Sequence, residues 1–188
     1  MYKRQALRRS WARRLGPANR VTLARAALVG GVTALVAGGG MDWRPRVVVL
    51  VAVATVALIL DAVDGHVARR TGSATAVGAR FDMEVDAFLI LVLSVFVARS
   101  LGVWWVLAIG AMRYVFVAAA WVLPWLRGEL PPSFARKVVA AVQGVVLVGA
   151  SAGLVGRPVT LAVVGAALAA LTWSFGRDVR WLWRRRAA

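Results

Sequence analysis

"DAVDGHVARRTGSATAVGARFDMEVDAF", residues 61–88, is a polar stretch between two long apolar runs. It holds five of the eight acidic residues of the chain: Asp61, Asp64, Asp82, Glu84 and Asp86. The run before it, VVVLVAVATVALIL (47–60), and the run after it, LILVLSVFVA (89–98), carry no charge. This pattern predicts two apolar helices joined by a short basic turn, with their acidic ends side by side.

The whole chain is too apolar for an ordinary soluble domain. Of its 188 residues 61% are hydrophobic, and the mean hydropathy is +0.73. The core of one domain cannot enclose so much apolar surface, so the remainder should face lipid. The lack of cysteine excludes disulfides and thiolate metal sites, and the single histidine, His66, excludes a multi-histidine zinc site.

A helix needs about 20 residues to cross a bilayer, and we assign six such spans. They are roughly Val21–Ala37, Val47–Ala68, Phe81–Ala98, Val103–Leu126, Val138–Val155 and Pro158–Phe175. The predicted fold is therefore an all-α integral membrane protein with six transmembrane helices.

The segment before the first span has its own pattern. Leu7, Trp11 and Leu15 recur every four residues among arginines, which predicts a short interfacial helix on the cytoplasmic leaflet, with a disordered basic tail as the alternative. We accordingly divide the chain into a basic amphipathic juxtamembrane segment (1–16), a six-helix domain (17–180) and a basic C-terminal tail (181–188).

The net charge of +16 has two explanations, nucleic-acid binding and basic cytoplasmic loops. The basic residues flank apolar spans, and no soluble segment is long enough to form a nucleic-acid-binding face. If both termini lie on one side of the membrane, that side carries 19 of the 24 Lys and Arg residues. The positive-inside rule then predicts a cell-membrane protein with both termini and the acidic window on the cytoplasmic side.

Four acids of the window fall on two helical faces. Asp61 and Asp64 are three residues apart, Asp82 and Asp86 are four apart, and Glu84 lies half a turn away from the second pair. Carboxylates that converge repel one another, and a divalent cation relieves the repulsion. Oxygen ligands without cysteine favour Mg²⁺ or Mn²⁺, with Ca²⁺ also possible, and four carboxylates can hold two ions. The alternative is a solvated ion cluster in which the acids pair with Arg69, Arg70 and Arg80.

The window resembles the signature of the CDP-alcohol phosphatidyltransferase family, D-x2-D-G-x2-A-R-x8-G-x3-D-x3-D. Every spacing matches, and the fixed positions are Asp61, Asp64, Gly65, Ala68, Arg69, Gly78, Asp82 and Asp86. The resemblance implies six spans, a homodimer, and metal-dependent transfer of a phosphatidyl group from CDP-diacylglycerol to an alcohol with release of CMP. It implies that Asp61, Asp64 and Asp82 hold metal. Asp86 would be the general base and would also contact the second ion.

The resemblance also implies residues that bind the CDP-lipid. Within the signature these are Gly65, Ala68, Arg69 and Gly78. The segment PANRVTLAR (17–25) is similar to the family's Pro-Asn-x-x-Thr-x-x-Arg entry segment, with one extra residue after the proline, and adds Asn19, Thr22 and Arg25. The alternative for this segment is an ordinary helix start with basic boundary residues.

A phosphorylated acceptor would need cations of its own. The candidates are Arg113, halfway through the fourth predicted span, and Arg136 with Lys137 at the start of the fifth. Lys137 and Gln143 match a stretch in which many family members carry lysine and glutamine. For Arg113 the alternatives are snorkelling or a salt bridge to a carboxylate of the window, and for Arg136 and Lys137 the alternative is the positive-inside rule.

The acceptor itself stays open. The residue after Asp86 is Ala87, whereas members similar to phosphatidylglycerol-phosphate synthases have lysine there and those similar to phosphatidylinositol-phosphate synthases have arginine. Glycerol phosphate, inositol phosphate, phosphatidylglycerol (cardiolipin synthesis) and other polyols all remain. Two other classes compete with an enzyme: a divalent-cation or proton-coupled transporter, with acids spread toward mid-bilayer on broken helices, and a scaffold stapled by its acids.

Overall fold

The computed structural model describes residues 17–38, 43–71, 76–128, 130–131 and 133–186, and side chains are described there except at 17–20, 64–77 and 79. These residues form α-helices and two short 3₁₀-helices, without a strand. The helices are α2 (Pro17–Ala37), α3 (Trp43–Thr71), α4 (Ala76–Leu101), η1 (Trp104–Val106), α5 (Leu107–Val122), η2 (Pro124–Arg127), α6 (Phe134–Ala152) and α7 (Arg157–Arg185).

Proline and glycine mark where several of these helices begin and end. Pro124 begins η2 and Pro158 lies in the first turn of α7, where the missing amide hydrogen costs no helical hydrogen bond. Gly153 ends α6 with φ of 64°, a left-handed conformation that glycine adopts without steric cost. Pro124 also interrupts the fourth predicted span, so that Val103–Leu126 is divided among η1, α5 and η2.

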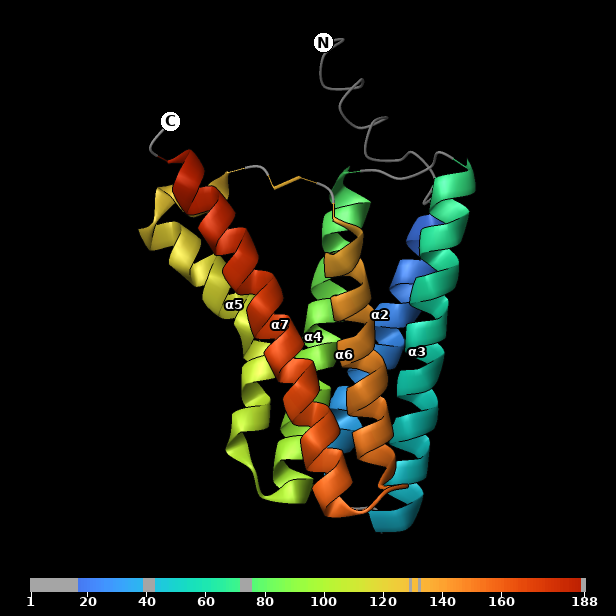
Figure 1. Cartoon of the computed structure of the whole chain (residues 1–188). Helices are drawn as coiled ribbons and strands as arrows, with labels where there is room; N and C mark the ends of the chain where they lie inside the picture. Colours follow the sequence, from blue (N-terminus) through green and yellow to red (C-terminus); the bar gives the residue numbers. More distant parts are fainter. Residues whose placement is uncertain (1–16, 39–42, 72–75, 129, 132, 187–188) are drawn as a thin grey trace.

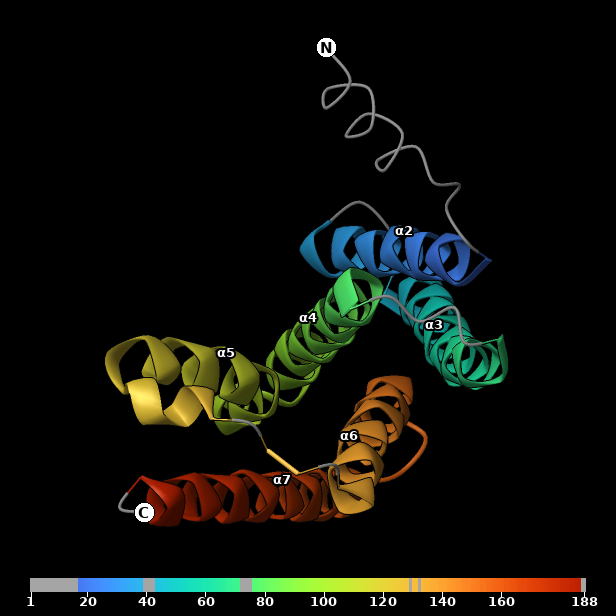
Figure 2. The same cartoon turned by 90° about the horizontal axis from the view of Figure 1, so that it is seen from above.

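The helices form a bundle in which α4 occupies the middle (Figures 1 and 2). It packs against α2, α5 and α6, while α2 also packs on α3 and α6 on α7. One side of the core consists of apolar side chains of α4. The buried ones are Val85, Leu89, Val92, Leu93, Phe96, Val97 and Ala98. α4 therefore holds the other helices around a single apolar core.

Many large apolar side chains point away from this core. Ile59 is 57% exposed on α3, Val115 64% on α5, Val145 67% on α6 and Val163 46% on α7. Burying such surface in lipid is favourable, whereas exposing it to water on four helices is not. The outward face of the bundle is therefore suited to a membrane.

Four helices among the described residues are long and apolar enough to cross a bilayer: Trp43–Val63, Trp104–Val122, Phe134–Ala152 and Arg157–Arg185. They indicate an integral membrane protein. The apolar part of α2, Val21–Ala37, is shorter. The uncharged stretch of α4 runs only from residue 87 to 98, because the acidic window occupies its first turns. A full set of six spans thus remains a prediction.

The structure describes only one of the two segments that were predicted to flank the six-helix domain. The interfacial helix predicted over residues 1–16 lies outside the described residues. α7 continues to Arg185, so most of the segment predicted as a C-terminal tail is the end of a helix.

Candidate active site

Three carboxylates converge between the C-terminal part of α3 and the N-terminal part of α4, six to ten residues from where α3 ends and α4 begins. Asp61 comes from α3, and Asp82 and Asp86 come from the first turns of α4. One oxygen atom from each lies within 4.8 Å of the others, and all three residues are half-buried. The end of α3 and the start of α4 lie at the same end of the bundle as the start of α2 and the end of α7 (Figure 1). The polar site therefore lies in this half of the bundle, about two to three helical turns inside the helix ends.

Arg25 of α2 lies at the centre of this aspartate cluster, which we define as Asp61, Asp82 and Asp86. Its Nη1 atom is 2.9 Å from Oδ1 of Asp61 and also donates to Asp82, while its Nη2 donates to Asp86. The Arg25 side chain is only 1% exposed. One guanidinium thus ties α2 to both α3 and α4.

The family resemblance implies a place for Arg25 near the nucleotide, and the sequence does not predict its ion pairs with the aspartates. Arg69, Arg70 and Arg80 are the cations of the alternative in which the acids form a solvated ion cluster. The signal was present, because an arginine inside a predicted span is costly without an anionic partner or water. This cost predicts an anionic partner for Arg25 just as it does for Arg113.

Several predicted site residues have side chains outside the described residues: Asn19, Asp64, Gly65, Ala68 and Arg69. The backbone of α3 is helical through residues 61–68, so the helical spacing that puts Asp61 and Asp64 on one face is present. Thr22 is buried, one turn before Arg25 on α2, and Gly78 is half-buried, one turn before Asp82 on α4.

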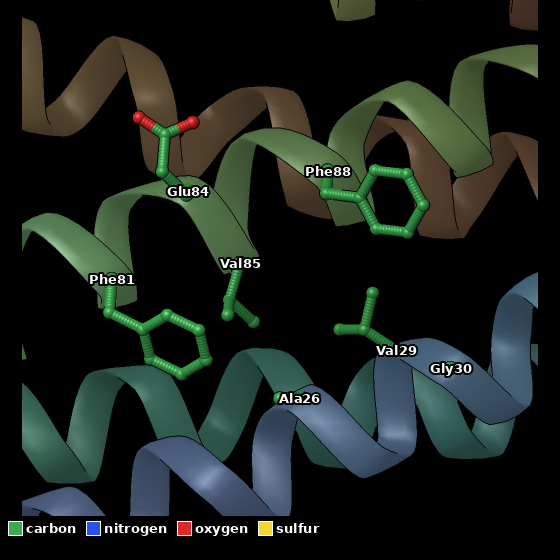
Figure 3. Close-up of a pocket in the computed structure, with 7 residues that line it drawn as sticks. All are labelled: Ala26, Val29, Gly30, Phe81, Glu84, Val85 and Phe88. Atoms are coloured by element: carbon green, nitrogen blue, oxygen red, sulfur yellow. The ribbon is translucent and has the colours of Figure 1, made fainter.

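Glu84 faces away from the aspartate cluster. It is about 200° around the helix from Asp82 and from Asp86, since an α-helix has about 3.6 residues per turn. Its carboxylate accepts a hydrogen bond from Nη2 of Arg113 on α5, and it points away from α2 in Figure 3. Arg113 thus forms a salt bridge to a carboxylate of the window, one of the two alternatives named for it.

Arg136 is also paired. Its Nη1 atom lies 3.1 Å from Oδ2 of Asp178 on α7, and its Nη2 donates to the carbonyl of Pro131. Asp178 is buried and lies 3.7 Å from Nη2 of Arg177, which in turn donates to Ser133 at 3.1 Å. Asp178 is a site residue that we did not predict, although it is the only acid in an otherwise basic C-terminal segment.

The other two residues of the acceptor stretch differ in burial. Lys137 is exposed and lies in the first turn of α6, as predicted for the start of the fifth span. Gln143 is buried and donates to the carbonyl of Ala167 at 2.9 Å, so it joins α6 to α7.

An apolar pocket of about 280 Å³ lies between α2 and α4 beside the aspartate cluster. Its lining consists of Ala26, Val29, Gly30, Phe81, Glu84, Val85 and Phe88 (Figure 3). Ala26 follows Arg25 in the chain, and Phe81 precedes Asp82. Polar and apolar binding surfaces are therefore adjacent on the same two helices.

The aspartate cluster fits a hard divalent cation. Carboxylate oxygens are the ligands that Mg²⁺ and Mn²⁺ prefer, and three oxygen atoms within 4.8 Å of one another can contact one ion. The net charge of the site also favours a cation, because three carboxylates and one guanidinium leave the site negative.

A comparison with protein families decides the class of the molecule. The model of the family described as CDP-alcohol phosphatidyltransferase matches residues 16–176. The chain belongs to this family. It is therefore an enzyme, a phosphotransferase for substituted phosphate groups that acts in phospholipid biosynthesis at a membrane. Divalent metals are used in this family, and the aspartate cluster lies within the matched region.

The family assignment rests on the family model alone. A search of curated proteins found no match to the chain. Members of the family transfer a phosphatidyl group from a CDP-alcohol. An apolar bundle with a carboxylate site at one end suits such a reaction, since its donor joins a charged nucleotide to lipid.

Proposed function

We propose that this enzyme transfers the phosphatidyl group of CDP-diacylglycerol to the hydroxyl of an alcohol and releases CMP, with Mg²⁺ or Mn²⁺ as cofactor. The observation that carries the proposal is the convergence of Asp61, Asp82 and Asp86 at one end of an apolar bundle. Carboxylates at such short distances from one another can bind a divalent cation. The reaction of the family takes place at a phosphorus atom, where divalent cations stabilise the charge that develops.

In this proposal Asp61, Asp64, Asp82 and Asp86 hold the metal, as two ions. Bound there, divalent cations neutralise charge that builds on the pyrophosphate and on the departing CMP. The protein's own contribution is to hold the carboxylates on two helix ends, so that little reorganisation is needed when the substrate arrives.

Asp86 is the proposed general base. The acceptor oxygen forms a bond to the phosphorus of the phosphatidyl group, the bond from that phosphorus to the CMP oxygen breaks, and Asp86 takes the hydroxyl proton. An alcohol has a very high pKa, so its attack needs a base within hydrogen-bond reach. The half-buried position of Asp86 leaves its carboxylate accessible to a substrate.

The proposed donor site surrounds the aspartate cluster. The CDP part contacts residues of three segments: Asn19, Thr22 and Arg25 on α2, Gly65, Ala68 and Arg69 on α3, and Gly78 on α4. The apolar pocket between α2 and α4 supports a lipid donor, because an acyl chain needs an apolar surface next to the reacting phosphate.

The proposed acceptor site uses Arg113, Arg136 and Lys137. The salt bridges of Arg113 with Glu84 and of Arg136 with Asp178 hold both guanidiniums in place. A guanidinium held in this way can bind a phosphate with less loss of side-chain entropy. The acceptor class is therefore a phosphorylated or otherwise anionic polyol, and the experiment below separates its members.

The membrane arrangement belongs to the same proposal. The apolar runs of the sequence support six spans, the distribution of Lys and Arg supports termini and an active site on the cytoplasmic side, and the family resemblance is the basis for a homodimer. A transporter is less well supported, since α3 and α4 are continuous over their described lengths and carry their acids at one end.

The test is CMP release by the purified protein. CDP-diacylglycerol, Mn²⁺ or Mg²⁺ and one acceptor at a time are supplied, with glycerol 3-phosphate, inositol phosphate and phosphatidylglycerol in the panel. We expect CMP with one acceptor and none with EDTA. No metal-dependent CMP with any anionic or neutral polyol would refute the proposal.

A further inference from the structure

The guanidinium of Arg25 uses the same carboxylate groups that suit a metal ion. Two of its nitrogen atoms contact all three aspartates, with Nη1 shared between Asp61 and Asp82 and Nη2 on Asp86. The oxygen atoms that form the candidate metal site belong to these same three side chains. The cation of the protein and a cation from solution therefore share one set of ligands.

A metal ion in contact with all three carboxylates would lie close to the guanidinium of Arg25. Oxygen ligands lie about 2.0–2.1 Å from Mg²⁺, and the three carboxylate oxygens are at most 4.8 Å apart. An ion in contact with all three would occupy the space between them. The Nη1 atom of Arg25 lies 2.9 Å from Asp61 and also contacts Asp82, so it occupies part of the same space.

Displacing the Arg25 guanidinium from the three carboxylates is unfavourable unless another cation takes its place. Its side chain is 1% exposed, and its Nε atom is buried without a hydrogen-bond partner among the described residues. The compensation comes from the three carboxylates on α3 and α4. Removing one partner of a buried ion pair leaves the other charge uncompensated, which destabilises the folded protein.

We propose that Arg25 is the positioning residue of the carboxylate site and competes with the divalent cation for Asp61, Asp82 and Asp86. Its guanidinium holds the three side chains together, and the cation must displace it from at least one of them in order to bind. Arg25 thereby lowers the affinity of the site for metal. The inference rests on the metal site of the proposed function and concerns the affinity of that site.

The test measures Mn²⁺ binding and thermal stability in detergent, without lipid substrates. The variants are Arg25→Gln, which removes the charge, and Arg25→Lys, which keeps the charge but cannot bridge three carboxylates from two nitrogen atoms. The matched control is Arg99→Gln, which removes the same charge from an exposed position in the last turn of α4.

For Arg25→Gln we expect the apparent affinity for Mn²⁺ to rise by about tenfold or more, since a cation beside a carboxylate changes its proton binding by about that factor and a dication meets the same repulsion from Arg25. In EDTA its Tm falls below that of the wild type, and Mn²⁺ raises its Tm by more than it raises the wild-type value. Arg25→Lys gives a smaller gain in affinity, and Arg99→Gln matches the wild type.

An Mn²⁺ affinity of Arg25→Gln equal to or weaker than that of the wild type would overturn the competition, as would a wild-type protein that binds no Mn²⁺. If Arg25→Gln does not fold, Arg25→Lys decides, and a wild-type Mn²⁺ affinity in that variant overturns the inference. These readouts do not depend on CMP release, so the proposed reaction and the role of Arg25 can fail separately.

Discussion

The three acidic side chains in the first turns of α4 lie on two opposite faces of this helix. Asp82 and Asp86 meet Arg25 of α2, while Glu84 meets Arg113 of α5. Acids two residues apart on one helix thus serve different neighbours, because each residue turns the side chain by about 100°. Substitutions at these positions should consequently have separable effects.

Asp86→Asn should reduce kcat by about 10²- to 10⁴-fold, because an amide cannot take the proton of the acceptor hydroxyl. Binding of CDP-diacylglycerol should be largely retained. Glu84→Gln, on the same helix but outside the aspartate cluster, is the matched control and should keep its kcat at saturating substrate. CMP release and donor binding are measured on both variants, and full turnover in Asp86→Asn would remove this residue as the base.

Arg113→Gln and Arg136→Gln should raise the KM for a phosphorylated acceptor about tenfold or more, because a hydrogen bond to a charged group contributes about 1.5–3 kcal/mol. The KM for CDP-diacylglycerol should change little. Steady-state kinetics with each substrate varied in turn measures both values. For either residue, an unchanged acceptor KM would leave its ion pair, with Glu84 or Asp178, as a purely structural contact.

Whole helices approach one another closely where small residues allow it, and α4 and α5 cross at Gly110. A Cβ atom added to Gly110 would lie 2.5 Å from the Cα atom of Leu91 and 2.5 Å from Oγ of Ser94. Neither a backbone atom nor a short side chain can yield by that much without moving the helix. α5 carries Arg113, so the spacing of these two helices also positions the Arg113–Glu84 pair.

Gly110→Val should therefore destabilise the protein by about 1–3 kcal/mol, the usual cost of overpacking a core. Gly149→Val on α6 is the control, since a Cβ atom at Gly149 would meet nothing within 4 Å. It shares the change in helix propensity and lacks the clash. Thermal unfolding in detergent measures both, and equal Tm values for the two variants would contradict the close α4–α5 crossing.

At the scale of the whole molecule, the bundle has two polar ends that are chemically different. The aspartate cluster lies toward the end where α3 ends and α4 begins, and the opposite end holds the α6–α7 connection (Figure 1). The chain contains no cysteine, so single cysteines can report which end faces the cytoplasm.

We expect Leu154→Cys, at a position 84% exposed between α6 and α7, to react with a membrane-impermeant maleimide in intact cells. Arg184→Cys, at an exposed position in the last turn of α7, should react only after the cells are made permeable. The reverse pattern would turn the proposed orientation around, with the active site on the outer side.

Much of the fold could be predicted from the sequence because it depends on local spacing. The helical character of all six predicted spans is present in the described structure, and the division of Asp82, Glu84 and Asp86 between faces follows from 3.6 residues per turn. The family could be predicted too, since its signature is a set of spacings within one short window. Such features are determined by the covalent geometry of a helix.

Contacts between distant segments could not be predicted in this way. Arg25 is 57 residues from Asp82, and Arg136 is 42 from Asp178. Which cation neutralises which acid depends on how α2 lies against α4 and how α6 lies against α7. The sequence by itself determined the helices, the apolar surface and the acidic faces, whereas only the tertiary packing decided that Arg25 lies among the aspartates, because an ion pair forms between the charges that packed helices bring within reach.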